Sequence, residues 1–323
     1  MKAAVHTKYG PPDVVRIADV PRPTTSDNDV LVRVYATTVN RTDCGYRAGR
    51  PFIVRLFSGL RKPRATVLGN EFAGRVESVG AAVTSFAVGD QVFGYCEGAF
   101  GAHAEYLSIP QDSPVAIMPP NLSYEEAAPG TEGAHYALAF ITRAKIRSGQ
   151  QVLVNGATGA IGSAAVQLLK SEGVHVTAVC RTENVALVKR LGADRVIDYA
   201  TEDFTASHDS YDVILDTVGK STFGRCKHLL NDRGIYLSSE LGPYSQNLFL
   251  PLLTPLLRGR RVVFPLPKQN ARIVAYLKEL MENGEFSPVI DRRYPLEEIV
   301  AAYRYVESGQ KVGNVVITVV EPA

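Results

Sequence analysis

Residues 152–170, VLVNGATGAIGSAAVQLLK, constrain the fold of this chain more than any other segment. An apolar, strand-like run leads into a glycine-rich turn, and a helix-like run follows from about Ala160. Ala157, Gly159 and Gly162 occupy the three positions of the dinucleotide-binding pattern, with Ala in place of the first Gly. The bare backbone of such a turn lets a pyrophosphate approach, and the helix start points unpaired N–H groups at the anion. The alternative is a turn without a ligand, but its place between a strand and a helix favours a bound dinucleotide.

The sequence from Gln151 onward alternates between apolar strand-like runs and helix-like runs. The strand-like runs are VLVNG, VHVTAVC, RVID, YDVILDTVG, GIYLSS and RVVFPL. Because most of their positions are apolar, these strands suit a sheet that is covered on both faces. The alternation predicts a doubly wound parallel sheet of the Rossmann type. RVVFPL should be its last strand, with an edge that would be a liability unless it is covered.

The first part of the chain, about 120 residues, has a different sequence pattern. Short Val-rich segments such as DVLVRVYATTVN and AGRVESVG recur between Gly, Pro, Asp and Asn residues, which predicts an antiparallel β-domain of partial-barrel form. A late strand, NVVITVV, could return to this first domain. We therefore expect an α/β protein with a β-domain of residues 1–122 and 292–323 and a dinucleotide-binding domain of residues 123–291.

Length, charge and cysteine usage narrow the class of protein. A chain of 323 residues is long enough for two domains, and its net charge of +2 favours neither nucleic acid nor anionic membrane as a general partner. No apolar run approaches the roughly 20 residues that span a bilayer, and the first residues lack the apolar core of a signal peptide. The four cysteines lie far apart, without metal-ligand spacing. These features predict a soluble, reduced, cytoplasmic protein.

The strand VHVTAVC is followed by a cofactor-selecting position. An NAD-binding protein usually offers an acid to the ribose hydroxyls there, whereas this chain offers Arg181, followed by Thr182 and Asn184. An Arg suits a 2′-phosphate by its charge and its forked donors, and one charge-assisted hydrogen bond is worth about 1.5–3 kcal/mol. Arg181 could instead be a solvated surface charge, with Glu183 an exposed acid at a helix start. We expect NADPH to be preferred over NADH.

Several segments together resemble the medium-chain dehydrogenase/reductase superfamily, in particular its zinc-independent quinone oxidoreductase branch. They are VNRTDCGYRAG, LGNEFAGRVESVG, VGDQVFG, GAHAEYL, NGATGAIGSAAVQLLK, LGADRVIDY and GQKVGNVVITV. The resemblance covers nearly the whole chain and implies a chaperonin-10-like (GroES-like) β-barrel domain, closed by the C-terminal segment, together with a Rossmann domain. It also implies a homodimer, because relatives pair the edge of the last Rossmann strand across a two-fold axis.

The same resemblance predicts that the chain has no metal site. Zinc-dependent relatives bind catalytic metal through a Cys and a His-Glu pair, and this chain has Asn40 and Asn70 at the Cys and His positions, with Glu71 retained. Neutral amides are poor zinc ligands compared with thiolate or imidazole. The four-cysteine lobe of the zinc enzymes is also missing. His103 and His135 remain as isolated candidates, but single histidines are more often structural.

A chain without a metal needs an acceptor that conjugation already activates. The resemblance implies an NADPH-dependent, zinc-independent oxidoreductase that transfers hydride to a quinone or an α,β-unsaturated carbonyl, while the protein supplies orientation. It further implies that Asn40 hydrogen-bonds the acceptor oxygen and that Tyr46 shapes the pocket or donates a hydrogen bond. Alternatively, Asn40, Thr42 and Asp43 could cap a short helix, and Tyr46 could pack with its hydroxyl in water. Two other functions are open: a 2-enoyl-thioester reductase, and a low-turnover NADPH-binding sensor or assembly protein.

Further cofactor contacts follow from the resemblance. Tyr199 would lie near the adenosine phosphate, Val218 near the adenine and ribose, and Ser239 and the turn 264–266 near the nicotinamide. The complete predicted cofactor set is Thr131, Ala157, Thr158, Gly159, Ala160, Ile161, Gly162, Arg181, Asn184, Tyr199, Val218, Ser239, Phe264 and Leu266.

One departure from the family pattern concerns the nicotinamide. Relatives often have a Thr that touches it at the position of Gly133 in this chain. Thr131 lies two residues earlier and could substitute for it.

Residues 50–64, RPFIVRLFSGLRKPR, are longer and more apolar than a plain turn requires. Large apolar residues alternate there with Arg and Lys. The segment could be a lid, a partner surface, a membrane-touching loop, or a surface loop with solvated charges.

Overall fold

The computed structural model describes residues 1–96, 98–257, 259–265, 267 and 270–321. The chain forms two compact units, the first of residues 1–132 and 269–323 and the second of residues 133–268. Each unit has its own sheet, as predicted from the change between short Val-rich strands and alternating strands and helices along the sequence. Among the helices in the described part of the chain, none has both the length and the apolar character that crossing a membrane requires.

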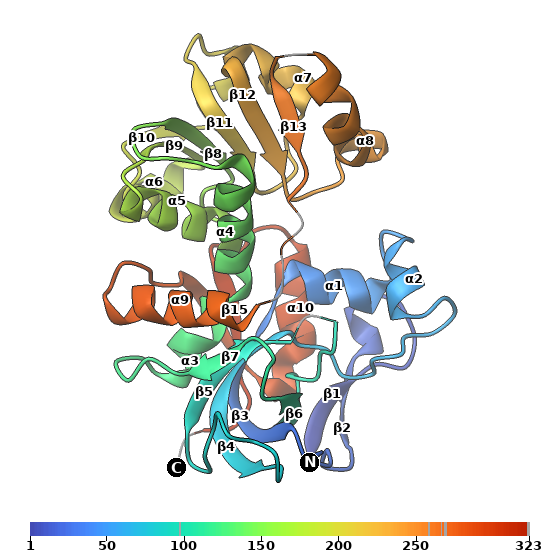
Figure 1. The fold of residues 1–323 in the computed structure, drawn as a ribbon. Coiled ribbons are helices and arrows are strands. Elements are labelled where there is room, and N and C mark those ends of the chain that lie inside the picture. Colours follow the sequence, from blue (N-terminus) through green and yellow to red (C-terminus); the bar gives the residue numbers. More distant parts are fainter. Residues whose placement is uncertain (97, 258, 266, 268–269, 322–323) are drawn as a thin grey trace. The chain divides into compact units, whose positions relative to one another are not determined.

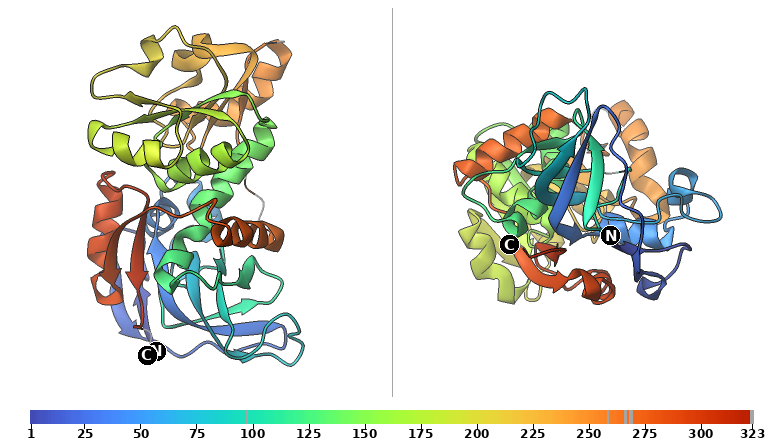
Figure 2. Two further views of the ribbon diagram at one scale, coloured as in Figure 1. Left: turned by 90° about the vertical axis from the view of Figure 1, so that its left-hand side faces the viewer. Right: turned by 90° about the horizontal axis from the view of Figure 1, so that it is seen from below.

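The first unit is built on a seven-stranded sheet in the order β14-β15-β3-β4-β5-β7, with β6 also paired to β3 (Figures 1 and 2). All neighbours are antiparallel except β14 and β15. Its strands are β3 Asp29–Val39, β4 Glu71–Val79, β5 Gln91–Tyr95, β6 Tyr106–Pro110, β7 Val115–Ile117, β14 Ile290–Pro295 and β15 Asn314–Thr318, and β1 Lys2–Val5 and β2 Arg16–Asp19 form a separate pair. The predicted return of NVVITVV to the first domain is confirmed, because β15 pairs with β3.

The helices of the first unit pack on this sheet. They are α1 Arg41–Ala48, α2 Val54–Ser58, α3 Tyr124–Ala127, α9 Ala271–Glu282 and α10 Ile299–Glu307, with short 3-10 turns at Pro12–Val14, Ala128–Gly130 and Leu296–Glu298. One core joins α10 to β15 through fully buried side chains such as Tyr303 and Ile317. A second core lies within the sheet, around Phe72 and Val92. These two cores fix the positions of the ends of β3 and β4, which carry residues of the candidate site.

The second unit has a six-stranded, all-parallel sheet in the order β10-β9-β8-β11-β12-β13, which is the Rossmann arrangement that the alternating pattern predicted. The strands are β8 Gln151–Asn155, β9 His175–Cys180, β10 Arg195–Asp198, β11 Tyr211–Asp216, β12 Leu230–Ser238 and β13 Arg261–Val263. The helices are α4 Glu132–Ala144, which begins at the last residue of the first unit, α5 Ala160–Ser171, α6 Val185–Arg190, α7 Phe223–Cys226 and α8 Gln246–Leu253. Short 3-10 turns lie at Thr182–Asn184, Phe204–Ala206, Lys227–Leu229, Pro243–Ser245 and Thr254–Leu257. RVVFPL supplies the edge strand β13, as expected.

The borders between the units differ from those expected at residues 122 and 291. Helix α3 packs against β3 and β4, and α9 packs against β7, so both helices belong to the first unit. The apolar face of α9 buries Leu277 and Met281, and the Met281 side chain approaches Gly130. The sequence pattern had placed both helices in the dinucleotide-binding domain. Helical periodicity does not reveal the sheet on which a helix packs.

Candidate active site and nucleotide-binding turn

The glycine-rich turn joins β8 to α5. Gly156 has a positive φ of 83°, and Gly159 occupies the N-cap of α5 without any side-chain cap, so the first N–H groups of this 12-residue helix are left for a ligand. A Cβ on Gly162 would lie 2.1 Å from the Gly156 carbonyl oxygen, whereas a Cβ on Gly159 would meet nothing closer than 3.7 Å. Packing of helix on strand therefore requires Gly162. The space beside the Gly159 Cα, by contrast, is not filled by any protein atom.

The predicted cofactor residues of the second unit follow the carboxyl ends of its strands. Because all the strands are parallel, these ends form one edge of the sheet, where open α/β folds bind their ligands. After β8 comes the turn with Ala157, Thr158, Gly159, Ala160, Ile161 and Gly162, after β9 Arg181 and Asn184, after β10 Tyr199, after β11 Val218, after β12 Ser239, and after β13 Phe264. The structure thus brings these residues to a common edge. Leu266 lies outside the described residues.

Two hydrogen bonds and one contact fix the backbone of this edge. The amide N–H of Tyr199 donates to the Cys180 carbonyl at 3.0 Å, and that of Ser239 donates to the Asp216 carbonyl at 3.1 Å. The Val218 side chain covers Gly156 so closely that a Cβ there would lie 2.4 Å from Val218 Cγ1. The side chains of Tyr199 and Val218 are themselves exposed.

Asp216 ties three strands together at this edge, a role that sequence reasoning missed. Its buried carboxylate accepts hydrogen bonds from Asn155 Nδ2 at 3.0 Å, from the Ser221 N–H at 3.1 Å and from the Tyr236 hydroxyl at 3.0 Å. The signal was available, because an acid ends the apolar run of residues 213–215. Asp216 thereby orders the ends of β8, β11 and β12 around the glycine turn.

Arg181 has acidic neighbours. Its Nη1 lies 3.3 Å from Glu183 Oε1, and both side chains are more than half exposed. The Thr182 hydroxyl donates to Asp198 Oδ2 at 2.6 Å, and this bond, the Ala200 N–H and the Arg181 charge lower the pKa of Asp198. A phosphate arriving at Arg181 would therefore compete with Glu183.

Asn40 caps helix α1 in the first unit. Its Oδ1 accepts from the Asp43 N–H at 3.0 Å while Asp43 Oδ2 accepts from the Asn40 N–H at 3.0 Å, forming a capping box. Its Nδ2 donates to Asn70 Oδ1 at 2.8 Å, and Asn40 is buried. The helix-capping alternative is thus realised. The second N–H of the Asn40 side-chain amide has no hydrogen-bond partner among the described residues.

Tyr46 lies one turn after Thr42 on α1, so the two side chains share a face of the helix. The Tyr46 ring packs on Phe100 with a centroid distance of 4.6 Å and an angle of 58°. Tyr46 is partly exposed. The structure therefore places a half-buried phenol on an aromatic support, on the same face of α1 as Thr42.

A buried carboxylate network lies beneath α1. Glu71 accepts four hydrogen bonds, from the Thr38 hydroxyl, the Thr131 N–H, the Thr131 hydroxyl and the Glu132 N–H, at 2.6–3.1 Å. Burial raises the pKa of Glu71, and these bonds oppose that rise. The Thr42 hydroxyl in turn donates to Glu132 Oε1 at 2.6 Å. Sequence reasoning missed Glu132, because its partners come from distant segments.

The predicted nicotinamide contact of Thr131 has no support in this arrangement. Thr131 is fully buried and belongs to the first unit, where both its N–H and its hydroxyl donate to Glu71. The departure from the family pattern at Gly133 has a steric cause. A Cβ at Gly133 would lie 2.8 Å from the Ala160 carbonyl oxygen, so a Thr would push into the start of α5.

The residues at the zinc-ligand positions do not fit a zinc ion. Asn40 and Asn70 are amides hydrogen-bonded to each other, and every hydrogen bond of the Glu71 carboxylate described above comes from a protein donor. His103 donates from Nε2 to the Thr38 carbonyl at 2.7 Å, and burial lowers its pKa to about 4. Within the described ranges, no group of three or more His, Cys, Asp or Glu residues could hold a metal ion. Burial likewise lowers the pKa of His135 to about 4.

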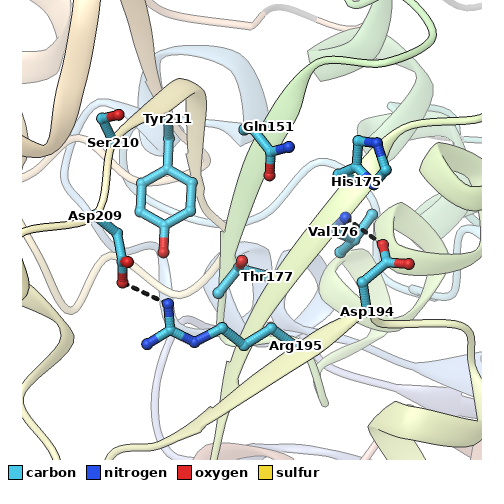
Figure 3. Close-up of a pocket in the computed structure, with 9 residues that line it drawn as sticks. All are labelled: Gln151, His175, Val176, Thr177, Asp194, Arg195, Asp209, Ser210 and Tyr211. Atoms are coloured by element: carbon cyan, nitrogen blue, oxygen red, sulfur yellow. Dashed lines mark hydrogen bonds and ion pairs between the residues drawn. The ribbon is translucent and has the colours of Figure 1, made fainter.

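A cavity of about 250 Å³ lies at the opposite edge of the Rossmann sheet (Figure 3). It is lined by the first residues of four strands, Gln151, His175, Arg195 and Tyr211. Arg195 is held there by Asp209 at 2.5 Å. Because this cavity lies at the amino ends of the strands, it is not the predicted dinucleotide site.

The comparisons with known proteins agree with this architecture. Residues 26–120 match the alcohol dehydrogenase GroES-like domain, and residues 191–317 match the zinc-binding dehydrogenase family. The chain is 32% identical to a 2-methylene-furan-3-one reductase of Solanum lycopersicum, covering 98% of this chain and 79% of that protein. It is 30% identical, with the same coverage, to an NADPH-dependent alkenal/one oxidoreductase of Arabidopsis thaliana.

A solved structure shares the whole fold. The quinone oxidoreductase of Coxiella burnetii superposes with a TM-score of 0.89 at 28% identity, over 99% of both chains. The predicted fold, a Rossmann domain with a GroES-like domain, is confirmed, as is the family resemblance. The chain belongs to the medium-chain dehydrogenase/reductase superfamily, within its quinone oxidoreductase branch.

Proposed function

We propose that the chain is an NADPH-dependent, zinc-independent reductase of quinones or α,β-unsaturated carbonyls. The observation that carries the proposal is the Asn40–Asn70 hydrogen bond at the positions where zinc-dependent relatives carry metal ligands. Without a metal to polarise a carbonyl, the acceptor itself must be electron-poor. The names of the relatives agree, since one reduces 2-methylene-furan-3-one and another alkenals and alkenones.

The residues of the second unit fit a dinucleotide. The unused space at Gly159 and the free N–H groups at the start of α5 suit a pyrophosphate. When bound, NADPH supplies the hydride. We assign Ala157, Thr158, Ala160 and Ile161 to the same turn, Arg181 and Asn184 to the 2′-phosphate, and Tyr199, Val218, Ser239 and Phe264 to the remaining edge.

The first unit would hold the acceptor. Addition of hydride to the electron-poor carbon moves an electron pair onto the acceptor oxygen, and a proton must then reach the product. We assign the Tyr46 hydroxyl and the second Nδ2 hydrogen of Asn40 to that oxygen, and we take water or a nearby hydroxyl as the proton source. Thr42 is held by Glu132 and supports this face of α1.

Turnover with a panel of acceptors tests the function. We expect NADPH oxidation with quinones and enones, unchanged after treatment with a metal chelator, since no metal takes part. Reduction of 2-enoyl-thioesters alone would favour the enoyl reductase alternative. NADPH binding without turnover of any acceptor would favour a sensor or assembly protein. Loss of activity on chelation, restored by zinc, would contradict the metal-free assignment.

Replacing Arg181 by Ala should narrow the preference for NADPH. We expect NADPH affinity to fall about ten-fold or more while NADH affinity changes little, because only NADPH carries the phosphate that Arg181 would bind. Glu183→Gln should shift the preference the other way, since it removes the competing carboxylate 3.3 Å from Arg181. Fluorescence titration with both cofactors measures the effect. Equal affinities in the parent protein would contradict the assignment.

Removing the proposed acceptor donors should reduce turnover and spare cofactor binding. Tyr46→Phe keeps the ring on Phe100, and Asn40→Ser keeps a good N-cap but removes Nδ2. We expect each to lower the rate with acceptors about ten- to a hundred-fold, since an unpaired polar partner costs about 1–3 kcal/mol. A larger loss at Tyr46 would assign it the proton, because general acids contribute roughly 10²–10⁴-fold. Tyr106→Phe on β6 is the matched control, and parent rates in both site variants would place the acceptor elsewhere.

We also propose a cytoplasmic homodimer. The four cysteines are buried and unpaired, which suits a reducing compartment. The edge strand β13 packs against α8, whose Leu248, Phe249, Leu252 and Leu253 are exposed in a stretch without charged residues. An apolar face beside a free strand edge suits pairing with a second copy.

A further inference from the structure

Residues 50–64, termed the basic arm, carry a cluster of large apolar side chains in solvent. In Figures 1 and 2, α2 lies at the periphery of the first unit, away from its sheet. The exposed side chains are Phe52 at 67%, Ile53 at 46%, Leu56 at 56%, Phe57 at 70% and Leu60 at 60%. Phe52 and Ile53 directly precede α2, Leu56 and Phe57 lie within it, and Leu60 follows its end. Such a concentration of exposed large apolar side chains in one short segment usually marks an interaction site.

The basic arm is anchored to the rest of the unit at its base. The Tyr9 hydroxyl bonds to Ser58 Oγ at 2.7 Å and donates to the Gly59 carbonyl at 2.6 Å. The Arg55 guanidinium lies 4.7 Å from the Tyr9 ring centroid and donates to the Gly49 carbonyl. These contacts fix the base of the arm to the rest of the unit, and its apolar side chains are exposed to solvent from that fixed base.

The charge of the basic arm is of one sign. Its cations are Arg50, Arg55, Arg61, Lys62 and Arg64, and no acid occurs between Asp43 and Glu71. Arg50, Arg61, Lys62 and Arg64 are exposed, and none of them forms an ion pair with another described residue. The arm therefore offers several free positive charges around its apolar patch.

We propose that the basic arm docks the protein on an anionic lipid surface as a peripheral membrane contact. Aromatic and aliphatic side chains flanked by Lys and Arg suit the lipid interface, where apolar groups enter the headgroup boundary and cations meet anionic headgroups. A second copy is a poor occupant, because two-fold pairing would set five cations against five. The uncharged face of α8 differs in this respect and suits a protein partner. The net charge of the whole chain is only +2 and therefore does not reveal this local concentration of positive charge. The docking does not depend on which acceptor the enzyme reduces.

Co-sedimentation of the full chain with vesicles tests the basic arm. We expect binding to phosphatidylcholine vesicles that contain phosphatidylserine, little binding to phosphatidylcholine alone, and release by salt. The double variant Phe52→Ser with Phe57→Ser removes apolar contacts, and Arg61→Gln with Lys62→Gln removes charge. Each should weaken binding about ten-fold or more. Val88→Ser, at an exposed apolar position in the loop between β4 and β5, is the matched control and should bind as the parent does.

Three outcomes would overturn the proposal. The parent protein could remain in the supernatant with anionic vesicles at low salt, or the arm variants could bind lipid as the parent does. Alternatively, sedimentation velocity without lipid could show that the arm variants lose self-association, which would assign the arm to a second copy. Thermal melting and NADPH titration of each variant establish that it is folded, so weaker lipid binding then reports on the arm.

Discussion

Replacing Gly159 by Ala is expected to weaken NADPH binding about a hundred-fold while leaving the fold intact. The added methyl meets no protein atom closer than 3.7 Å, so packing tolerates it. It would occupy the space through which a pyrophosphate approaches the N–H groups at the start of α5. Loss of one to two charge-assisted hydrogen bonds, each worth about 1.5–3 kcal/mol, gives an effect of this size. Titration with NADPH and thermal unfolding measure the two quantities.

Gly162→Ala is the matched comparison, three residues along the same segment. Its methyl would lie 2.1 Å from the Gly156 carbonyl oxygen, and backbone cannot yield as a flexible side chain can. We expect it to destabilise the protein by about 1–3 kcal/mol through overpacking. NADPH binding by Gly159→Ala with parent affinity would remove the dinucleotide from this turn, whatever the stability of Gly162→Ala.

The contrast between these two glycines shows what the sequence could predict. Spacing alone identified a strand, a turn and a helix, because those elements are encoded by neighbouring residues. The separate requirements at Gly159 and Gly162 were also predictable from the pattern. The parallel pairing of the Rossmann sheet followed from the alternation of elements, since parallel strands need crossover helices.

The candidate acceptor site was less predictable, because its contacts join distant segments. Thr131 was expected to substitute for a family Thr at the nicotinamide, yet its partner is Glu71, 60 residues away. Asn40 had two open interpretations, and its bonds to Asp43 and to Asn70 realise the capping one. Glu132 was not singled out, because an acidic residue in the first turn of a helix is ordinary. No local pattern indicates that its carboxylate is buried against Thr42.

We expect His103 to make the free energy of unfolding fall in acid by an amount large enough to measure. The Thr38 carbonyl can only accept, so Nε2 carries the proton, and the Tyr303 hydroxyl, 3.4 Å from Nδ1, donates to that nitrogen. Both ring nitrogens are thus committed in the neutral form. Burial lowers the pKa of His103 from 6.5 to about 4. Protonation in the native state would require a buried cation and would break the bond from Tyr303.

The sign of the resulting pH dependence follows from the two states. Between about pH 6.5 and pH 4 the unfolded chain binds a proton at His103 and the native chain does not, so the free energy of unfolding falls as the pH falls. The slope is about 1.4 kcal/mol per pH unit for a fully shifted group, or about 3 kcal/mol over the whole window. His135, whose pKa burial also lowers to about 4, adds a similar term in the second unit. The raised pKa of Glu71 acts with the opposite sign, because a group that binds its proton more tightly in the native state loses stability as the pH rises.

A variant isolates the contribution of His103 from these other groups. Gln at position 103 can still donate to the Thr38 carbonyl but cannot titrate, so we expect His103→Gln to lose about 2 kcal/mol less than the parent between pH 7 and pH 5. Urea unfolding of both proteins at the two pH values measures the difference, and His175→Gln, at an exposed position at the start of β9, controls for the substitution itself. If His103→Gln lost as much stability as the parent between these pH values, the imidazole would have to be protonated or solvated in the native protein. The hydrogen bonds to Thr38 and from Tyr303 could not then both hold.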